Sequence, residues 1–303
     1  MLTVGVCTYR RASLSDTLRA LAAQTRPADR IVVADNDEAP SARGLCEAAA
    51  GQGAPVVYVH APARNIAIAR NACLDRADGL LAFIDDDETA PPGWLEELTA
   101  ALVPGLAGVS GPSVAIYPEG APAWMRALSP HSQRPPAIHE RDQIGHTANC
   151  LLDPAHPALA GLRFDSRFGR SGGEDTDYFQ RAFARGARFG VADAPVFEPV
   201  TPERLSAAWL AERRRRAGRA WLASLPARRR RTALAALPKV AWCRGRAAAA
   251  RGEEARRAAW LRGLFHEGVV SAGLGVRPSE HYGALPDGAE ASPSSQTLPD
   301  RSR

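Results

Sequence analysis

Hydrophobic and polar positions alternate in blocks along the first third of the chain. Four short, mainly apolar runs have the length of single strands: 2–9, 30–35, 56–60 and 80–84. Four other stretches repeat apolar residues at helical spacing: 14–24, 41–51, 66–77 and 94–103. Short continuous apolar runs separated by helices are typical of parallel strands that are buried on both faces. The pattern therefore predicts an open, mostly parallel α/β sheet with flanking helices and right-handed crossovers.

Polar residues collect directly after each of the four predicted strands. Strand by strand, they are Thr8, Tyr9 and Arg10; Asp35, Asn36 and Asp37; Asn65 and Arg70; and Asp85, Asp86 and Asp87. In open parallel sheets the carboxyl ends of the strands share one edge, and ligands bind in the crevice outside it. The sequence therefore predicts a single binding site at that edge.

The acids in "LLAFIDDDETAPPGW" allow two interpretations. Adjacent carboxylates raise one another's pKa unless a cation neutralises them, and Mg²⁺ often binds one or two carboxylates together with substrate phosphates. The same residues also fit a solvated loop with an acid near the start of the next helix. A metal beside nucleotide-facing residues would indicate a nucleoside diphosphate, whose departure the cation assists as a Lewis acid.

A second acidic stretch, "SGGEDTDYF", opens a helix predicted at 174–185. Gly172 and Gly173 allow the backbone to approach a ligand closely. A carboxylate such as Asp175 could serve as the general base for an attacking hydroxyl. Acids in a first turn also favour the helix dipole, so the sequence is equally consistent with a structural role.

The middle of the chain, residues 111–146, is Pro-rich and is predicted to be irregular. A long loop of this kind is often a lid or a binding loop, and we expect Trp124 within it to be a packing residue. A last strand is predicted at 189–192.

From residue 205 the chain is Ala/Arg-rich and is predicted to be helical, with breaks at Pro226 and Pro238. The sequence thus divides into an α/β domain that carries the predicted binding site, a basic helical region and a disordered tail, at 1–202, 203–282 and 283–303.

Charge is unevenly distributed along the chain. From Thr201 onward 20 Lys and Arg oppose 9 Asp and Glu, giving +11, whereas the remainder has 18 against 24, giving −6. The two tetra-arginine runs, 213–216 and 228–231, fit either a solvated helical face or an anionic membrane surface. Lipid attachment would contribute about 1 kcal/mol per basic residue near the surface. The few interleaved aromatic residues argue against nucleic-acid binding.

Several classes of protein are disfavoured by what the sequence lacks. No run of 18 apolar residues is present, so no membrane-spanning helix is expected, and the N-terminus has no secretory-leader pattern. Five cysteines without CxxC spacing fit buried thiols in a reducing cytoplasm. The absence of GxGxxG and GxxxxGK[ST] argues against dinucleotide dehydrogenases and P-loop enzymes.

Five motifs follow one another along residues 2–200: "VCTYRR", "IVVADND", "ARNIAIARNACLD", "LLAFIDDDE" and "GGEDTDYFQR". In this order they resemble the family 2 glycosyltransferases, which have the GT-A fold, and especially the exopolysaccharide transferases of succinoglycan type. The resemblance implies inverting transfer of a sugar from a nucleoside-diphosphate sugar to an acceptor hydroxyl, with Mn²⁺ or Mg²⁺ as cofactor. Uridine is the expected base because the family uses it most often.

The resemblance also implies roles for individual residues. Contacts with the donor are implied at Thr8, Tyr9, Arg10, Asp35, Asn65, Arg70, Asp85 and Asp86. Within this set Asp35 would bind the base. Asp87, together with Asp85, would ligate the metal of the DxD-type motif. Glu174 and Asp175 form the "ED" motif, with Asp175 as the expected base. The chain departs from the family pattern at Ala67, where a glycine is usual beside the nucleotide.

The expected acceptor is a saccharide or a lipid-linked saccharide in bacterial polysaccharide or envelope synthesis. The expected location is the cytoplasm, including the inner face of the plasma membrane. Two alternatives are a nucleotidyltransferase and a non-catalytic scaffold that docks on membranes. The first usually has a Gly-rich basic loop after the first strand, which "TYRRASLS" does not supply. The second is disfavoured by the presence of Asp87 and Asp175.

Overall fold

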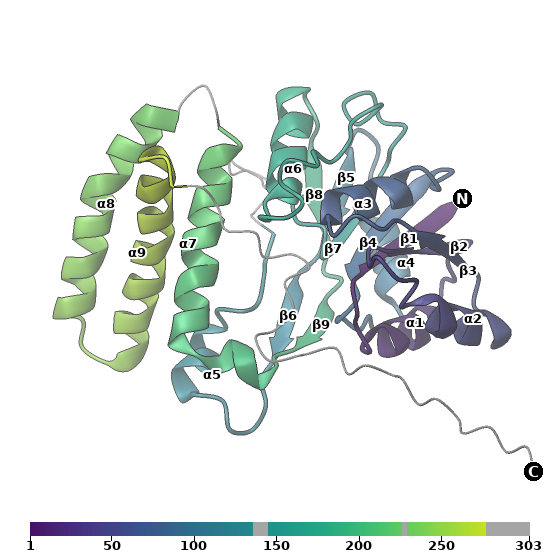
Figure 1. Cartoon of the computed structure of the whole chain (residues 1–303), viewed down its shortest axis with the longest axis horizontal. Coiled ribbons are helices and arrows are strands. Elements are labelled where there is room, and N and C mark those ends of the chain that lie inside the picture. Colours follow the sequence, from purple (N-terminus) through teal and green to yellow (C-terminus); the bar gives the residue numbers. More distant parts are fainter. Residues whose placement is uncertain (136–144, 226–228, 277–303) are drawn as a thin grey trace, which may run out of the picture.

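The computed structural model describes residues 1–135, 145–225 and 229–276 (Figure 1). Its main sheet has the strand order β3-β2-β1-β4-β7-β5-β8. The strands are β1 (Leu2–Thr8), β2 (Arg30–Asp35), β3 (Val56–His60), β4 (Leu80–Asp85), β5 (Gly108–Ser110), β7 (Asn149–Leu152) and β8 (Phe189–Val191). Neighbouring strands are parallel except for β7, which is antiparallel to both β4 and β5. The predicted mostly parallel α/β sheet is confirmed.

Helices cover both faces of this sheet. They are α1 (Leu14–Ala22), α2 (Arg43–Gly51) and α4 (Trp94–Ala101) on one face, and α3 (Ile66–Leu74) and α6 (Glu174–Ala184) on the other. Successive side chains of a strand point to opposite faces. In β4, Ile84 accordingly packs with the first group of helices and Phe83 with the second. Apolar residues are needed on both faces, which explains why the strands read as continuous apolar runs.

A second sheet lies beside the first and was not expected from the sequence. It consists of β6 (Ser113–Ile116) and β9 (Val196–Pro199), which pair in parallel. With helix α5 (Ala123–Leu128), β6 shows that the Pro-rich segment is not irregular throughout, so that prediction was wrong for these residues. Trp124 is buried in a small apolar core, as predicted. The lid role remains a prediction, and residues 136–144 lie outside the described part.

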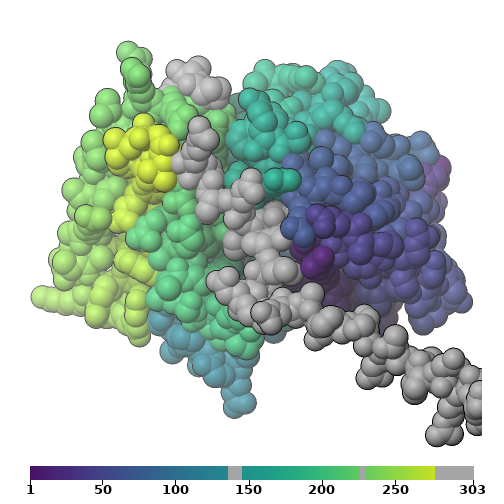
Figure 2. Space-filling view, viewed as in Figure 1, coloured from purple at the N-terminus to yellow at the C-terminus, as the bar shows by residue number. Residues whose placement is uncertain are grey.

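The C-terminal region is helical, as predicted. A short 3₁₀ helix, η1 (Pro202–Leu205), leads into α7 (Ala207–Ala223), α8 (Arg229–Ala249) and α9 (Glu253–Gly273). In Figure 1, α7 is the helix of this group that lies nearest to the sheets, and Figure 2 shows the group in green to yellow as one lobe beside the sheet domain. The backbones of α7 and α9 cross closely at Gly218 and Gly268, where added Cβ atoms would lie 2.1 and 2.0 Å from carbonyl oxygens of the opposite helix.

Three further expectations concern this region and the cysteines. Helix α8 continues through Pro238, so the predicted break there was wrong, and Pro226 lies outside the described residues. The tail predicted to be disordered also lies outside them. All five cysteines are buried free thiols, as predicted. Within residues 1–135, 145–225 and 229–276, none of the helices has the length and apolar character needed to cross a membrane.

Candidate active site

The strand register brings the predicted polar residues to one edge of the main sheet. Thr8 at the end of β1 lies opposite Asp35 of β2, and Cys7 lies opposite Asp85 of β4. The ends of three neighbouring strands therefore meet at the same level. The residues that follow them, together with the start of α6, form the candidate active site.

The run of acids after β4 is held in place by hydrogen bonds to its last member, Glu88. Glu88 is buried, its Oε2 accepts a hydrogen bond from the Asp85 N–H at 3.1 Å, and its Oε1 accepts one from the Ser113 hydroxyl of β6. These contacts fix the turn that follows β4 and tie it to the second sheet. The sequence did not single out Glu88 because its partner lies in the unpredicted second sheet.

Burial raises the pKa of the first two acids of the run. It raises the pKa of Asp85 to about 6; the Arg70 charge opposes this shift and Asp87 adds to it. It raises the pKa of Asp86 to about 7, with Asp87 adding to the shift and the Thr8 hydroxyl opposing it. The Asp85 side chain remains 41% exposed. The acids are thus closely spaced and mutually repelling, and one of them is open to a ligand.

Arg70 joins the strand edge to the start of α6. Its guanidinium donates a hydrogen bond to Glu174 Oε1 and lies 3.7 Å from Asp85 Oδ1. Arg70 and Glu174 are 7% and 5% exposed. Glu174 Oε2 is also buried and accepts no hydrogen bond from the described residues. The motifs "ARN", "DDDE" and "GED" are therefore brought together; the first two were predicted to share the sheet edge, and the structure adds the third.

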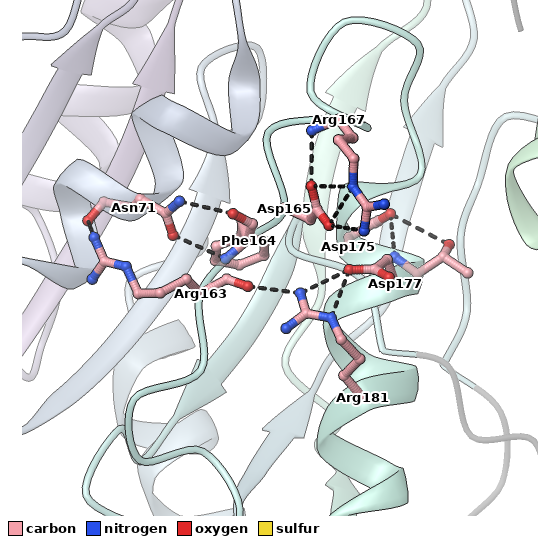
Figure 3. Close-up of polar contacts among 9 residues, drawn as sticks. Asn71, Arg163, Phe164, Asp165, Arg167, Asp175, Asp177 and Arg181 are labelled. Atoms are coloured by element: carbon pink, nitrogen blue, oxygen red, sulfur yellow. Dashed lines mark hydrogen bonds and ion pairs between the residues drawn. The ribbon is translucent and has the colours of Figure 1, made fainter. Parts of the chain in front are cut away.

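The acids at the start of α6 have different partners, as Figure 3 shows. Asp177 forms an ion pair with Arg181 at 2.7 Å, so it has a structural role on the helix. Asp175 Oδ1 accepts a hydrogen bond from the Thr176 N–H at 2.6 Å, and Asp175 forms no ion pair with a described residue. Gly173 precedes the helix at φ +97°, a conformation that favours glycine. The Asp175 carboxylate is therefore available to an incoming ligand.

Two predicted donor-binding residues are engaged within the protein. The Asp35 carboxylate accepts hydrogen bonds from the Ala42 N–H at 2.8 Å and the Tyr58 hydroxyl at 2.9 Å. The Asn65 side chain donates to the Ser166 carbonyl at 2.9 Å and accepts from the Ile68 N–H at the start of α3. These contacts hold the loops of the site, and a nucleotide contact by either residue remains a prediction.

The segment after β1 borders a small cavity. Arg10 has φ +55° and donates to Asp37 Oδ2 at 2.8 Å. Burial of Asp37 would raise its pKa, but the hydrogen bond and charge of Arg10 outweigh this effect and lower it. A cavity of about 180 Å³ lies between Arg10, Arg11 and the start of α2. Thr8 lies beside Asp86 in the same region. The predicted nucleoside-facing segment is therefore at the site, and its contacts with the donor remain predictions.

Sequence analysis missed a cluster around Asp87 that comes from the second half of the chain. Arg204 of η1 donates to Asp87 Oδ2 at 3.1 Å and also to Glu198 of β9. Arg11 lies 3.9 Å from the same Asp87 oxygen. Burial, followed by the charge of Asp87, raises the pKa of Glu198. The contact between Arg204 and Asp87 joins residues 117 positions apart, so no local sequence pattern could have indicated it.

The residues at the strand edge fit a divalent cation that shares its ligands with a substrate. Among the described residues, no group of three or more His, Cys, Asp or Glu side chains is arranged to hold a metal by itself. Asp85 and Asp87 offer hard oxygen donors whose mutual repulsion a cation would relieve. Two carboxylates with diphosphate oxygens are a usual environment for Mg²⁺. The donor set therefore fits such an ion in the presence of a phosphorylated ligand.

Comparison with known proteins agrees with this geometry. The family described as "Glycosyl transferase family 2" matches residues 3–166. The chain is 42% identical over 296 residues to "Succinoglycan biosynthesis protein ExoM" of Rhizobium meliloti (strain 1021), covering 93% of this chain and 96% of that protein. The resemblance to transferases of succinoglycan type is thus confirmed.

Two solved structures share the fold at low sequence identity. The mannosyltransferase PcManGT from Pyrobaculum calidifontis, in complex with GDP-Man and Mn²⁺, is 19% identical with a TM-score of 0.60, covering 89% of this chain and 86% of that one. A structure of S. aureus TarS, residues 1–349, is 15% identical with a TM-score of 0.53, covering 90% and 70%. The family match and the 42% identical relative show that this chain is a member of glycosyltransferase family 2 with a GT-A-like fold.

Proposed function

We propose that the chain is an inverting, metal-dependent transferase that moves a sugar from a nucleoside-diphosphate sugar, with UDP favoured, to an acceptor hydroxyl. The observation that carries this proposal is the meeting of Asp85 and Asp87 with Asp175, linked through Arg70 and Glu174. Acids that can share a cation with a diphosphate lie on one side, and a carboxylate available as a base lies on the other.

Asp175 is the proposed general base. It has no charged partner among the described residues, so it can accept the proton of the acceptor hydroxyl as that oxygen attacks the anomeric carbon. Attack from the face opposite the diphosphate inverts the configuration of that carbon. Glu174 keeps Arg70 in place beside the strand edge, because the two buried groups neutralise one another.

Asp85 and Asp87 would hold the Mn²⁺ or Mg²⁺. When bound, the cation supplies Lewis-acid stabilisation of the charge on the departing diphosphate. Arg204 and Arg11 lie beside Asp87 and add positive charge at the same end of the site. Fixed charges placed where negative charge develops are among the strongest contributors to catalysis.

The biological setting is proposed from the relative named for succinoglycan biosynthesis. We propose that the acceptor is a saccharide, free or lipid-linked, in exopolysaccharide assembly. Membership of a glycosyltransferase family favours this reaction over a nucleotidyltransferase, and the available Asp175 favours it over a non-catalytic scaffold. We do not propose nucleic acid as a partner.

A peripheral position on the cytoplasmic face of the membrane is proposed from α8 rather than from α7. Helix α8 carries no acidic residue and exposes Leu234, Leu237 and Trp242 between basic residues. Such a face suits an anionic lipid surface. In liposome flotation, Leu234→Ser combined with Trp242→Ser should release the protein from anionic vesicles. Binding unchanged by these substitutions would contradict the proposal.

The test of the catalytic proposal is thermal stabilisation of the full chain by UDP, GDP, dTDP, CDP and ADP, each with and without Mn²⁺ or Mg²⁺. A diphosphate at about 100 times its Kd should stabilise the fold by about 2.7 kcal/mol. We expect one diphosphate to act in a metal-dependent manner and the effect to disappear in Asp87→Asn. Asp177→Asn is the matched control, because Asp177 lies outside the proposed metal ligands. No response to any diphosphate would refute the proposal.

A further inference from the structure

One face of α7 runs along the candidate active site. At helical spacing this face carries Trp209, Arg213, Arg216 and Ala220. At one end the Trp209 ring stacks on His131, with centroids 5.4 Å apart, and lies under the Arg204 guanidinium that binds Asp87. At the other end Ala220 packs against Gly173, where an added Cβ would lie 2.6 Å from the Ala220 Cβ.

These two contacts place the arginines between them within the site. The Trp209 end lies by the proposed metal ligand Asp87, and the Ala220 end lies by the helix start that carries Asp175. Arg213 follows Trp209 by one turn, and Arg216 precedes Ala220 by one turn. Figure 1 shows α7 beside α6 at this boundary between the sheets and the C-terminal helices. Arg213 and Arg216 therefore do not belong to a solvated helical face, and lipid binding by the first arginine run remains a prediction.

The charges on this face are not neutralised within the described part of the chain. Arg215 pairs with Glu267 at 3.1 Å and Arg219 pairs with Glu212, whereas Arg213 and Arg216 form no ion pair with a described residue. Arg213 lies over the Trp209 ring, 5.3 Å from its centroid, and Glu198, whose charge favours the Arg213 cation, is already bound by Arg204.

Arg213 and Arg216 are also half-buried rather than solvated. Burial lowers the pKa of both; Glu198 opposes this shift at Arg213 and Glu212 opposes it at Arg216, whereas neighbouring arginines add to it. Half-buried positive groups without an ion-pair partner destabilise a folded protein unless a ligand supplies the opposite charge. Such an arrangement is typical of a binding site and not of a structural ion-pair network.

We propose that Arg213 and Arg216 bind a negatively charged group of the acceptor, a phosphoryl or a carboxylate group, on the face of α7 that runs from the Asp87 end to the Asp175 end of the candidate active site. The inference deepens the proposed function and rests on it, since it assigns an acceptor side to that site. Guanidinium groups suit both anions because their N–H donors match pairs of oxygens.

Two observations favour the acceptor over the donor as the occupant. Arg204 and Arg11 already lie at the Asp87 end of the site, where the donor diphosphate is proposed to bind. The arginine face continues beyond them toward Asp175, which must lie beside the acceptor hydroxyl if it removes its proton. An acceptor hydroxyl at Asp175 would therefore place the adjoining part of the same molecule along α7.

The experiment uses full-length protein and two small anions, phenyl phosphate and glucuronate, titrated calorimetrically in the presence of saturating UDP and Mn²⁺. Benzyl alcohol and glucose serve as the uncharged counterparts. We expect at least one anion to bind, neither uncharged compound to bind, and Arg213→Gln or Arg216→Gln to weaken the anion about ten- to a hundredfold. The anion that binds identifies the group. Arg256→Gln removes an exposed charge of α9 and should leave anion binding unchanged.

The melting temperature and UDP binding distinguish an acceptor site from a donor site and from a general loss of stability. Each glutamine variant should melt at the same temperature as the parent or higher, since it removes an uncompensated buried charge. UDP binding with Mn²⁺ should be unchanged. If UDP binding falls as much as anion binding, the arginines serve the donor and the inference is wrong. It is equally wrong if no anion binds the parent protein, or if Arg256→Gln has the same effect. Anion binding without any nucleotide binding would keep this anion site while refuting the proposed transferase.

Discussion

Replacing Arg70 by methionine would leave the Glu174 carboxylate buried without its counter-charge. Both groups are under a tenth exposed, at 7% and 5%, so water cannot easily replace the lost partner. Removing one member of a buried ion pair costs about 3–5 kcal/mol. The neighbouring Asp85 side chain is 41% exposed and gives water some access from one side. We therefore expect a loss at the lower end, about 3 kcal/mol in the free energy of unfolding.

The loss should depend on pH with a defined sign. Without Arg70, burial raises the pKa of Glu174 above that of the unfolded chain. The folded state then binds more protons than the unfolded state, so stability falls as pH rises. Urea unfolding of Arg70→Met should accordingly show a larger deficit at about pH 8 than at about pH 5.

The double variant Arg70→Met/Glu174→Leu provides the control. Replacing both members of a buried pair by apolar groups is often neutral or stabilising, so the double variant should recover most of the lost stability. The reasoning is refuted if the single and double variants are equally unstable, or if the deficit of the single variant does not change with pH.

Three further predictions test other parts of the structure. Asp175→Asn should lower kcat by about 10²- to 10⁴-fold while leaving nucleotide binding intact, whereas Asp177→Asn should retain activity and lose only about 0.5 kcal/mol in urea unfolding. Gly268→Ala should lower the free energy of unfolding by about 1–3 kcal/mol, because the new Cβ would lie 2.0 Å from a carbonyl oxygen of α7. Gly245→Ala in α8 is the control, because its new Cβ would meet no atom within 4 Å and should not destabilise the fold. Burial lowers the pKa of His131 from 6.5 to about 4, so between pH 6.5 and pH 4 the unfolded chain binds more protons than the folded one. The free energy of unfolding should therefore fall by about 3 kcal/mol as the pH drops from 6.5 to 4, and urea denaturation of His131→Gln should lack this contribution.

The first half of the fold could be predicted because its signals are local. Each strand from β1 to β4 is an uninterrupted apolar run, and each intervening helix has its own apolar stripe. Parallel pairing of these strands then places Thr8, Asp35 and Asp85 at a common edge, whatever the strand order. The site residues at this edge follow from the same rule and needed no knowledge of long-range contacts.

The remainder depended on contacts that no short pattern encodes. Strand β6 has only four residues, and its partner β9 begins 83 residues after the start of β6. Pro238 is tolerated because α8 packs along α9, where tertiary contacts offset one missing backbone hydrogen bond. The arginines of α7 look like a solvated stripe in sequence, and only the contacts at Trp209 and Ala220 reveal the surface that they face.

The candidate active site is built from two stretches of chain, and this has a consequence for how it can be altered. The match to the family ends at residue 166, after the strand edge and before Asp175, η1 and α7. The 42% identical relative nevertheless covers 93% of the chain, so it shares both stretches. Substitutions along α7 can change its side of the site while the strand edge stays the same. A chimaera joined within the loop between β7 and α6 would exchange α6 and α7 together with β8 and β9, and would keep the edge formed by β1, β2 and β4.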